Sequence, residues 1–159
     1  MKKNLTRIYI GNNLSTNVRI FYKFTNMINK KILKKDLIYP ELSYQIIGVL
    51  FEVYNQLGPG YHEKYYQKAV AAGFNESGLS FKEQVCVPLT FKDCNVGRYF
   101  LDFVVDNKIV IEIKKGERFS KKNIDQIVAY LKSNALKLGI IANFGSRELK
   151  FRRIINFDS

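Results

Sequence analysis

The chain has 159 residues, 47% of them hydrophobic, which suffices for one well-buried domain and is too short for two. No apolar stretch approaches the roughly 20 residues that span a bilayer, and no secretory signal pattern opens the chain, so we expect a soluble protein of the cytoplasm, without a membrane partner. The only cysteines, Cys86 and Cys94, lack the spacing of a metal-binding motif, which argues against a structural zinc site.

The net charge of +12 is unevenly distributed along the chain. Residues 1–36 carry nine basic residues and one acidic residue, whereas the remaining 123 residues have a net charge of only +4. Release of counterions from phosphates favours basic proteins, so nucleic acid is a natural partner, although lysine clusters on a surface are often only solvated. We predict a basic N-terminal appendage over residues 1–35 and a single folded domain over residues 36–159.

The appendage allows several interpretations. Residues 6–10 and 18–24 are compatible with two short strands, but the polar stretch between them gives no firm register. One hypothesis places the natural start at Met27, because the pattern changes abruptly after Asn26. The others are a basic arm that binds nucleic acid and a targeting sequence.

Two helices are predicted at the start of the domain. Apolar residues recur at helical spacing over residues 40–57, and Gly58-Pro59-Gly60 ends that helix. A second helix is predicted over residues 61–76. Glu63 lies near its beginning, where the positive end of the helix dipole favours a carboxylate in any case.

Three strands are predicted next, over residues 81–91, 97–105 and 109–114. Asp106-Asn107 is a turn signal, so the second and third strands are expected to pair as a hairpin. The third is followed by a helix over residues 121–135 and by two further strands, over residues 137–142 and near 149–157. A strand, helix and strand in succession favour a parallel pair, so we predict an α/β domain with a mixed sheet.

The predicted hairpin carries an acid and an acid-x-lysine triplet. Side chains alternate across a strand, so Leu101 and Phe103 should share one face, and Glu112 and Lys114 should share another. The hairpin places Asp102, the only charge in its run, near Glu112. An acid among large apolar residues costs several kcal/mol to bury unless it is paired or bound to a cation, and this arrangement can hold a divalent metal against a phosphate.

A plainer interpretation of the same residues stays open. An acid-x-lysine triplet is common on the wet face of a strand. Asp102 could also form a hydrogen bond with a neighbouring lysine or a backbone amide and have no catalytic role.

Six motifs follow one another in the domain, and together they have a distinctive order and spacing. They are Gly60-x-x-Glu63-x-x-Tyr66, Asp102, Glu112-x-Lys114, Gln126, Tyr130-Leu131 and Asn143-Phe144-Gly145. In this the chain resembles the bacterial GxxExxY proteins, a family placed in the PD-(D/E)XK nuclease superfamily, over about residues 36–157. The resemblance implies a restriction-endonuclease-like core, with a central mixed β-sheet flanked by helices. The proline that precedes the first acid in the superfamily is absent, and Leu101 stands there.

The resemblance also implies a metal site. In superfamily members the corresponding acids bind magnesium, so Asp102 and Glu112 would hold Mg²⁺ or Mn²⁺, with the carbonyl oxygen of Ile113 completing the set. Lys114 would orient or deprotonate the attacking water. Glu63 would contact the metal or its water, whereas Tyr66 is expected to pack or to donate a supporting hydrogen bond.

The helix that follows the acids carries further candidates. Gln126 and Tyr130 resemble the Gln-x-x-x-Tyr pair of the RecB-like and lambda-exonuclease-like branch, where such residues help to position substrate. Helical spacing alone leaves Gln126 on a solvent-facing flank, so its catalytic role rests on the resemblance. Lys115, Lys122 and Tyr130 are the candidates for contact with nucleic acid. His62, the only histidine, is expected at the surface.

The function implied is a metal-dependent nuclease that hydrolyses phosphodiester bonds of nucleic acid, with DNA favoured, by attack of a metal-activated water. An alternative is a nucleic-acid-binding module on a nuclease scaffold that is inactive or needs a partner. A third is a basic interaction protein whose acids are only structural. Since many superfamily members dimerise to cut two strands, a homodimer is compatible with the first hypothesis.

Overall fold

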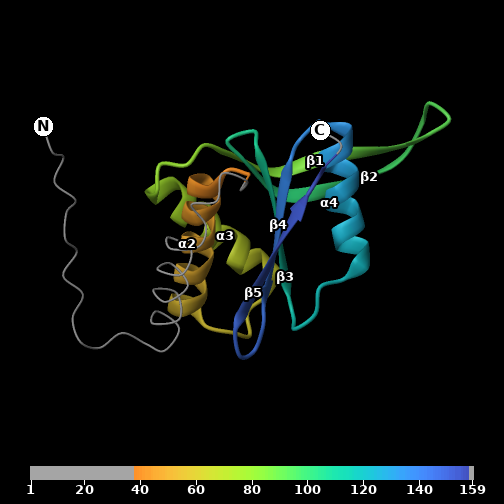
Figure 1. Ribbon diagram of the computed structural model, residues 1–159. Helices are drawn as coiled ribbons and strands as arrows, with labels where there is room; N and C mark the ends of the chain where they lie inside the picture. Colours follow the sequence, from red (N-terminus) through yellow and green to blue (C-terminus); the bar gives the residue numbers. More distant parts are fainter. Residues whose placement is uncertain (1–37, 158–159) are drawn as a thin grey trace, which may run out of the picture. The chain divides into compact units, whose positions relative to one another are not determined.

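The computed structural model describes residues 38–157; the predicted appendage and its two strands lie outside them. Five strands form one sheet in the order β1-β2-β3-β4-β5 (Figure 1). Their bounds are β1 Phe81–Phe91, β2 Cys94–Val105, β3 Ile109–Lys115, β4 Leu138–Phe144 and β5 Leu149–Ile155. Strands β3 and β4 are parallel and the other neighbours are antiparallel, so the predicted mixed sheet is confirmed.

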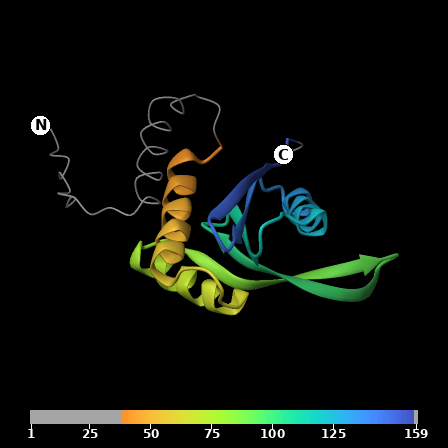
Figure 2. The ribbon, with the colours of Figure 1, turned by 90° about the horizontal axis from the view of Figure 1, so that it is seen from below.

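Helices cover both faces of this sheet. Helices α2 (Pro40–Leu57) and α3 (Glu63–Glu76) lie on one side and α4 (Lys121–Ser133) lies on the other (Figure 2). The predicted α/β class is therefore correct. None of the helices within residues 38–157 combines the length and the apolar character needed to cross a membrane.

Element boundaries depart from the predictions where turn geometry decides them. Strand β2 begins three residues earlier than predicted, because Lys92 and Asp93 both adopt positive φ and close a two-residue turn between Phe91 and Cys94. Helix α3 begins two residues later than predicted, because His62 is extended, with φ −72° and ψ 149°. Helix α4 ends at Ser133, before Ala135 takes a positive φ.

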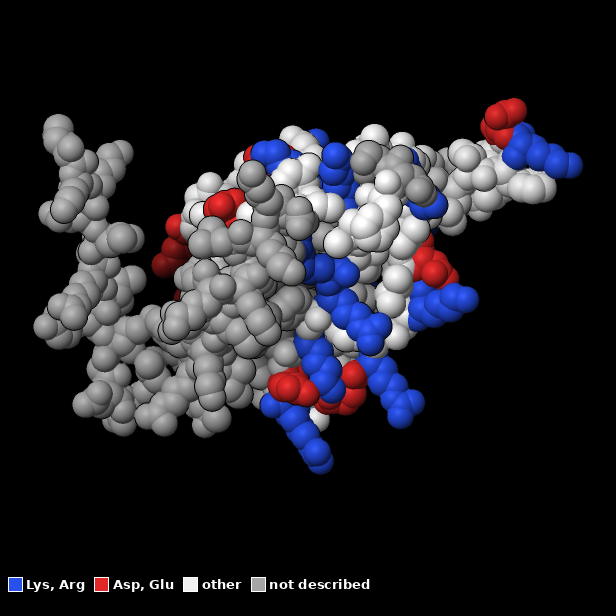
Figure 3. All heavy atoms as spheres, viewed as in Figure 1, with Lys and Arg blue, Asp and Glu red and all other residues white. Residues whose placement is uncertain are grey.

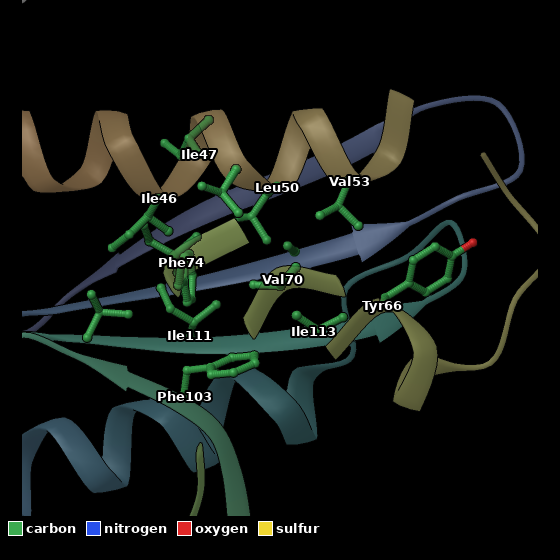
Figure 4. Packing of buried hydrophobic residues seen from close by; sticks show 14 of the residues in the cluster. Ile46, Ile47, Leu50, Val53, Tyr66, Val70, Phe74, Phe103, Ile111 and Ile113 are labelled. Carbon is green, nitrogen blue, oxygen red and sulfur yellow. The ribbon is translucent and has the colours of Figure 1, made fainter. Parts of the chain in front are cut away.

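The larger part of the core lies between the sheet and helices α2 and α3 (Figure 4). Tyr66 and Phe74 of α3 are fully buried there, together with Phe103 of β2. The two helices approach closely at Gly73, since a Cβ atom at this position would lie 2.6 Å from Cγ1 of Val49. This packing fixes the start of α3, which carries Glu63, against the sheet.

A smaller apolar cluster lies between the sheet and α4. Ile127 and Leu131 of the helix are fully buried and pack with Val110 of β3 and Ile141 of β4. The contact is tight at Gly139, where a Cβ atom would lie only 2.4 Å from Cγ2 of Ile127. Helix α4 can therefore approach the sheet this closely only because residue 139 is a glycine.

Alternation of side chains holds in β3 and fails in β2. Leu101 packs in the cluster under α4, whereas Phe103 packs in the cluster under α2 and α3, so the prediction that they share a face is wrong. The two faces exchange at Asp102, where pairing with β3 has ended. Opposite Asp102 in β1, Gln84 has a φ of 47° and interrupts the pairing between Glu83 and Val85. This distortion is also the place where the acids lie.

Beyond Asp102 the β1–β2 hairpin continues as a two-stranded arm. Strand β3 pairs with β2 only over Phe103–Val105, and the rest of the hairpin extends away from the sheet (Figures 1 and 2). Its turn carries one charge of each sign, Lys92 and Asp93, and the shaft shows mostly uncharged atoms on the face in view (Figure 3). Phe91 and Val96 are each 63% exposed there.

Candidate active site

The site is built where β2 separates from β3. The last paired residues are Phe103 and Ile111, and beyond them two carboxylates take the place of strand-to-strand hydrogen bonds. The backbone N–H of Ile113 donates to Oδ2 of Asp102 over 2.7 Å, and the N–H of Asp102 donates to Oε2 of Glu112 over a long 3.5 Å. The separation of the strands therefore holds both acids in fixed positions.

The two acids form a buried pair. Asp102 is 5% exposed and Glu112 is 6% exposed. The hydrogen bond from the Asp102 N–H to Glu112 makes them neighbours, as the predicted hairpin requires. Burial, and then the negative charge of Glu112, raise the pKa of Asp102 to about 7, although the Ile113 N–H and Lys114 act in the opposite direction. Such a pair carries more negative charge than its surroundings neutralise, which suits a cation.

Lys114 connects the pair to Glu63. Its Nζ atom lies 2.8 Å from Oε1 of Glu112 and 3.4 Å from Oε2 of Glu63. Burial lowers the pKa of this lysine, but the hydrogen bond to Glu112 and the surrounding carboxylates outweigh burial, and the net change is upward from 10.5. Lys114 is therefore a fixed ammonium group between two acids from different elements.

Glu63 is held by the end of β3. Its Oε1 atom accepts a hydrogen bond from the backbone N–H of Lys115 over 3.0 Å, and Nζ of Lys115 in turn donates to the carbonyl oxygen of Gly60 over 3.2 Å. The structure thus brings the predicted Glu63 to the site, where it contacts Lys114 and Lys115. Within residues 38–157 no three acidic, histidine or cysteine side chains are close enough to hold one ion together.

Two carboxylates are nevertheless a sufficient set for one kind of ion. Mg²⁺ usually binds one or two carboxylates and keeps several waters for its remaining positions. Asp102 and Glu112 are both buried and bridge the gap between β2 and β3, and Ile113 follows Glu112 directly in the chain. The donor set therefore fits a small divalent cation, with Glu63 further out.

Gln67 belongs to the site and was missed by the sequence analysis. Its Nε2 atom donates to Oδ1 of Asp102 over 2.7 Å, the oxygen that Ile113 leaves free. Gln67 lies four residues after Glu63, so both side chains lie on one face of α3. That spacing was the available signal, because a residue one turn after Glu63 faces the same part of the sheet.

Of the residues predicted on α4, Gln126 and Lys122 line a groove between that helix and β2, and the acids do not line it. Gln126 is partly exposed and lines an open groove of about 580 Å³ together with Lys122, and its carbonyl oxygen accepts a 3.4 Å hydrogen bond from the Tyr99 hydroxyl. No hydrogen bond among residues 38–157 joins the Gln126 amide to the acids or to Lys114. Tyr130 is half-buried, and burial raises the pKa of its phenol.

The remaining motif residues support the loops around the site. Tyr66 is fully buried and its hydroxyl donates to the carbonyl oxygen of Gly58 over 2.8 Å, which confirms its expected packing and hydrogen-bonding role. Its ring stacks on Phe144 with 4.2 Å between the centroids. Asn143 donates through Nδ2 to the carbonyl oxygen of Arg118 over 2.7 Å, which fixes the segment that leads to α4. His62 is exposed, as predicted.

Comparison with known proteins places this chain in a family. No curated protein matches the chain. Among solved structures, the crystal structure of SSO0001 matches with 13% sequence identity and a TM-score of 0.43, over 95% of this chain and 70% of the other. A family model described as the PD-(D/E)XK nuclease superfamily matches residues 40–154, which include all the site residues named above. The chain therefore belongs to the PD-(D/E)XK nuclease superfamily, and its mixed sheet with helices on both faces is the restriction-endonuclease-like fold of that superfamily.

Proposed function

We propose that this protein is a divalent-metal-dependent nuclease that cuts phosphodiester bonds, with DNA as the favoured substrate. The observation that carries the proposal is the buried Asp102–Glu112 pair with the Lys114 ammonium 2.8 Å from Glu112. Two acids and a lysine in this arrangement suit the hydrolysis of a phosphodiester, since negative charge must be both bound and offset. We also propose that, within this superfamily, the chain is one of the GxxExxY proteins.

Each residue has a distinct part in this proposal. Asp102 and Glu112, with the carbonyl oxygen of Ile113, would hold Mg²⁺ or Mn²⁺. When bound, such an ion lowers the pKa of water and offsets charge on the phosphate. Lys114 orients the attacking water and faces the charge that grows on the phosphate oxygens.

Glu63 and Gln67 act as positioning residues. Glu63 and Glu112 together hold the ammonium of Lys114, and Gln67 fixes Oδ1 of Asp102. In the proposed site Glu63 acts on the metal only through water or through Lys114. Lys115 and Lys122 are exposed and remain candidates for contact with phosphates.

A second candidate is a nucleic-acid-binding module that does not cut. The observation that favours it is the engagement of Glu63 with Lys114 and Lys115, which leaves only two acids adjacent to each other. This candidate predicts salt-sensitive binding of nucleic acid without cleavage, unchanged in the variant Glu112→Ala.

One experiment separates the candidates. The full chain is incubated with Mg²⁺ or Mn²⁺ and with single-stranded, double-stranded or branched DNA, or with RNA, next to Glu112→Gln and the control Asp106→Asn. Asp106 is an exposed acid of the β2–β3 turn that forms an ion pair with Lys108. Cleavage by wild type and Asp106→Asn but not by Glu112→Gln supports the nuclease. Absence of cleavage, together with absence of Mn²⁺ binding in calorimetry, refutes it.

A further inference from the structure

A groove runs between the hairpin arm and the first turns of α4. Its volume is about 580 Å³, within the size range of ligand sites. One wall is formed by Leu89 and Tyr99 of the hairpin, and the other is formed by side chains of α4, which are Lys121, Lys122, Asp125, Gln126 and Ala129. The proposed nuclease mechanism gives this groove no role.

The groove lies on the face of the sheet that carries Glu112, because its residue Tyr99 packs in the same cluster as Val110, two residues before Glu112 in β3. The Tyr99 hydroxyl donates to the carbonyl oxygen of Gln126 over 3.4 Å, so this hydrogen bond joins the two walls of the groove. Glu112 is near enough to Tyr99 to add to the rise that burial and Tyr130 cause in the pKa of its phenol. A chain lying in the groove would therefore run along the face of the sheet that carries Glu112.

The walls differ in character. Lys121 and Lys122 are exposed, and neither has an ion-pair partner among residues 38–157. Across from them Leu89 is 46% exposed, and Tyr99 is partly exposed with its hydroxyl held. One wall thus offers two positive charges to phosphates against the single negative charge of Asp125, and the other offers an apolar and aromatic surface.

We propose that this groove binds one unpaired strand of nucleic acid next to the bond that is cut, so that the substrates are nucleic acids with a single-stranded segment. This inference rests on the proposed nuclease function. Proteins that bind single strands combine a basic track with aromatic side chains on which bases stack. A duplex hides the faces of its bases and would leave the Leu89–Tyr99 wall without a partner, whereas an unpaired strand offers phosphates to the lysines and bases to that wall.

The first test measures binding rather than cleavage. Fluorescence anisotropy in EDTA compares a single-stranded oligonucleotide with a blunt duplex of the same sequence, over a series of salt concentrations. Wild type is expected to bind the single strand more tightly. The double variant Lys121→Ala/Lys122→Ala should reduce the slope of log affinity against log salt by about 1.4, since each phosphate contact on a single strand contributes about 0.7. Lys68→Ala, which removes an exposed lysine of α3 on the opposite side of the sheet, is the matched control.

The second test addresses the aromatic wall. Tyr99→Leu should weaken binding of the single strand about fivefold to a hundredfold, as expected from stacking energies of about 1–3 kcal/mol per base. Tyr99→Phe keeps the ring and should keep most of the affinity. Because Tyr99 is partly buried, circular dichroism of both variants checks that they fold. If Tyr99→Leu does not fold, the comparison of single strand with duplex and the double lysine variant decide the proposal.

The outcomes separate this inference from the proposed function. Equal affinity for single strand and duplex, or unchanged single-strand binding in the double lysine variant, overturns the groove proposal even if the protein cuts DNA. Selective single-strand binding that depends on both walls supports it even if no metal yields cleavage. If the protein is active, flapped or overhanging DNA should be cut faster than a blunt duplex.

Discussion

Gln67 and Asp102 are joined across two elements by a 2.7 Å hydrogen bond from the side-chain amide to Oδ1. The other oxygen of Asp102 accepts the N–H of Ile113, so both carboxylate oxygens have a fixed donor. Partners of this kind orient a metal-binding acid and are often as necessary as the acid itself. Helix α3 therefore contributes to the proposed metal site without supplying a direct ligand to it.

Replacing Gln67 with alanine should lower metal affinity or cleavage rate about tenfold to a hundredfold, because Asp102 loses one of its two donors. Calorimetry with Mn²⁺ and a cleavage assay measure the two quantities. Gln56→Ala is the control, since Gln56 is exposed on α2 and its side chain donates to that of Glu52. A Gln67→Ala protein with the metal affinity and the rate of wild type would show that the hydrogen bond has no role.

The pairing of Asp102 with Glu112 could be predicted from the sequence because it follows from local rules. The turn at Asp106-Asn107 sets the hairpin, and alternation in β3 sets the direction of Glu112 and Lys114. The mixed sheet and the parallel β3–β4 pair likewise follow from the order of strands and helices.

The rest of the site depends on tertiary packing. Sequence spacing does not reveal that Lys114 lies between Glu112 and Glu63, since the position of α3 on the sheet is set by side chains such as Tyr66 and Phe74. Nor does alternation reveal that Leu101 and Phe103 face opposite ways, because a distortion at Asp102 overrides the period of the strand.

Asp102→Asn should remove the stabilisation that a divalent ion gives to the folded protein. A ligand that binds only the folded state at a hundred times its Kd adds about 2.7 kcal/mol to the free energy of unfolding. Thermal unfolding of wild type should therefore shift upward as Mn²⁺ is added, and that of Asp102→Asn should not. Asp106→Asn, which changes an exposed acid in the β2–β3 turn, should shift as wild type does. Equal shifts in all three proteins would place any bound ion elsewhere.

Lys114→Met should abolish most of the cleavage while nucleic acid still binds. Methionine keeps much of the length of lysine and removes the ammonium that lies 2.8 Å from Glu112. A loss of about 10²–10⁴-fold in rate is the size expected when a positioned proton-transfer or charge-stabilising group is removed. Lys108→Met, at an exposed ion pair with Asp106, is the control. Full activity of Lys114→Met would remove this lysine from the mechanism.

Gly139→Ala should destabilise the protein by about 1–3 kcal/mol, the usual cost of an added methyl group in a tightly packed core. The new Cβ atom would lie 2.4 Å from Cγ2 of Ile127, so α4 must move away from the sheet. Urea unfolding measures the loss. In an Ile127→Ala background, which removes that methyl group, the same substitution should cost much less, and a double-mutant cycle gives the coupling. If the free-energy losses of Gly139→Ala and Ile127→Ala simply add, residues 139 and 127 are not in the close contact described here.

Glu117→Gln should destabilise the protein in a way that depends on pH. The carboxylate of Glu117 accepts the N–H of Ser146 over 2.5 Å and its hydroxyl over 2.8 Å, and these bonds, with Lys150, lower its pKa from the ordinary 4.5. Because the charged form is favoured in the folded state, its contribution is fully present above about pH 4.5 and is lost as the pH falls through the lower folded value.

The difference in free energy of unfolding between wild type and Glu117→Gln should therefore be largest near neutral pH and should shrink on acidification below pH 4.5, as urea titrations from pH 3 to pH 7 can measure. Glu148→Gln serves as the comparison, since it removes only an exposed ion pair with the same Lys150 and such pairs contribute little. Glu117 also joins the segment after β3 to the β4–β5 turn, where a Cβ atom at Gly145 would lie 2.8 Å from its Oε2. A constant difference across this pH range would mean that the Ser146 contacts do not depend on the charge of Glu117.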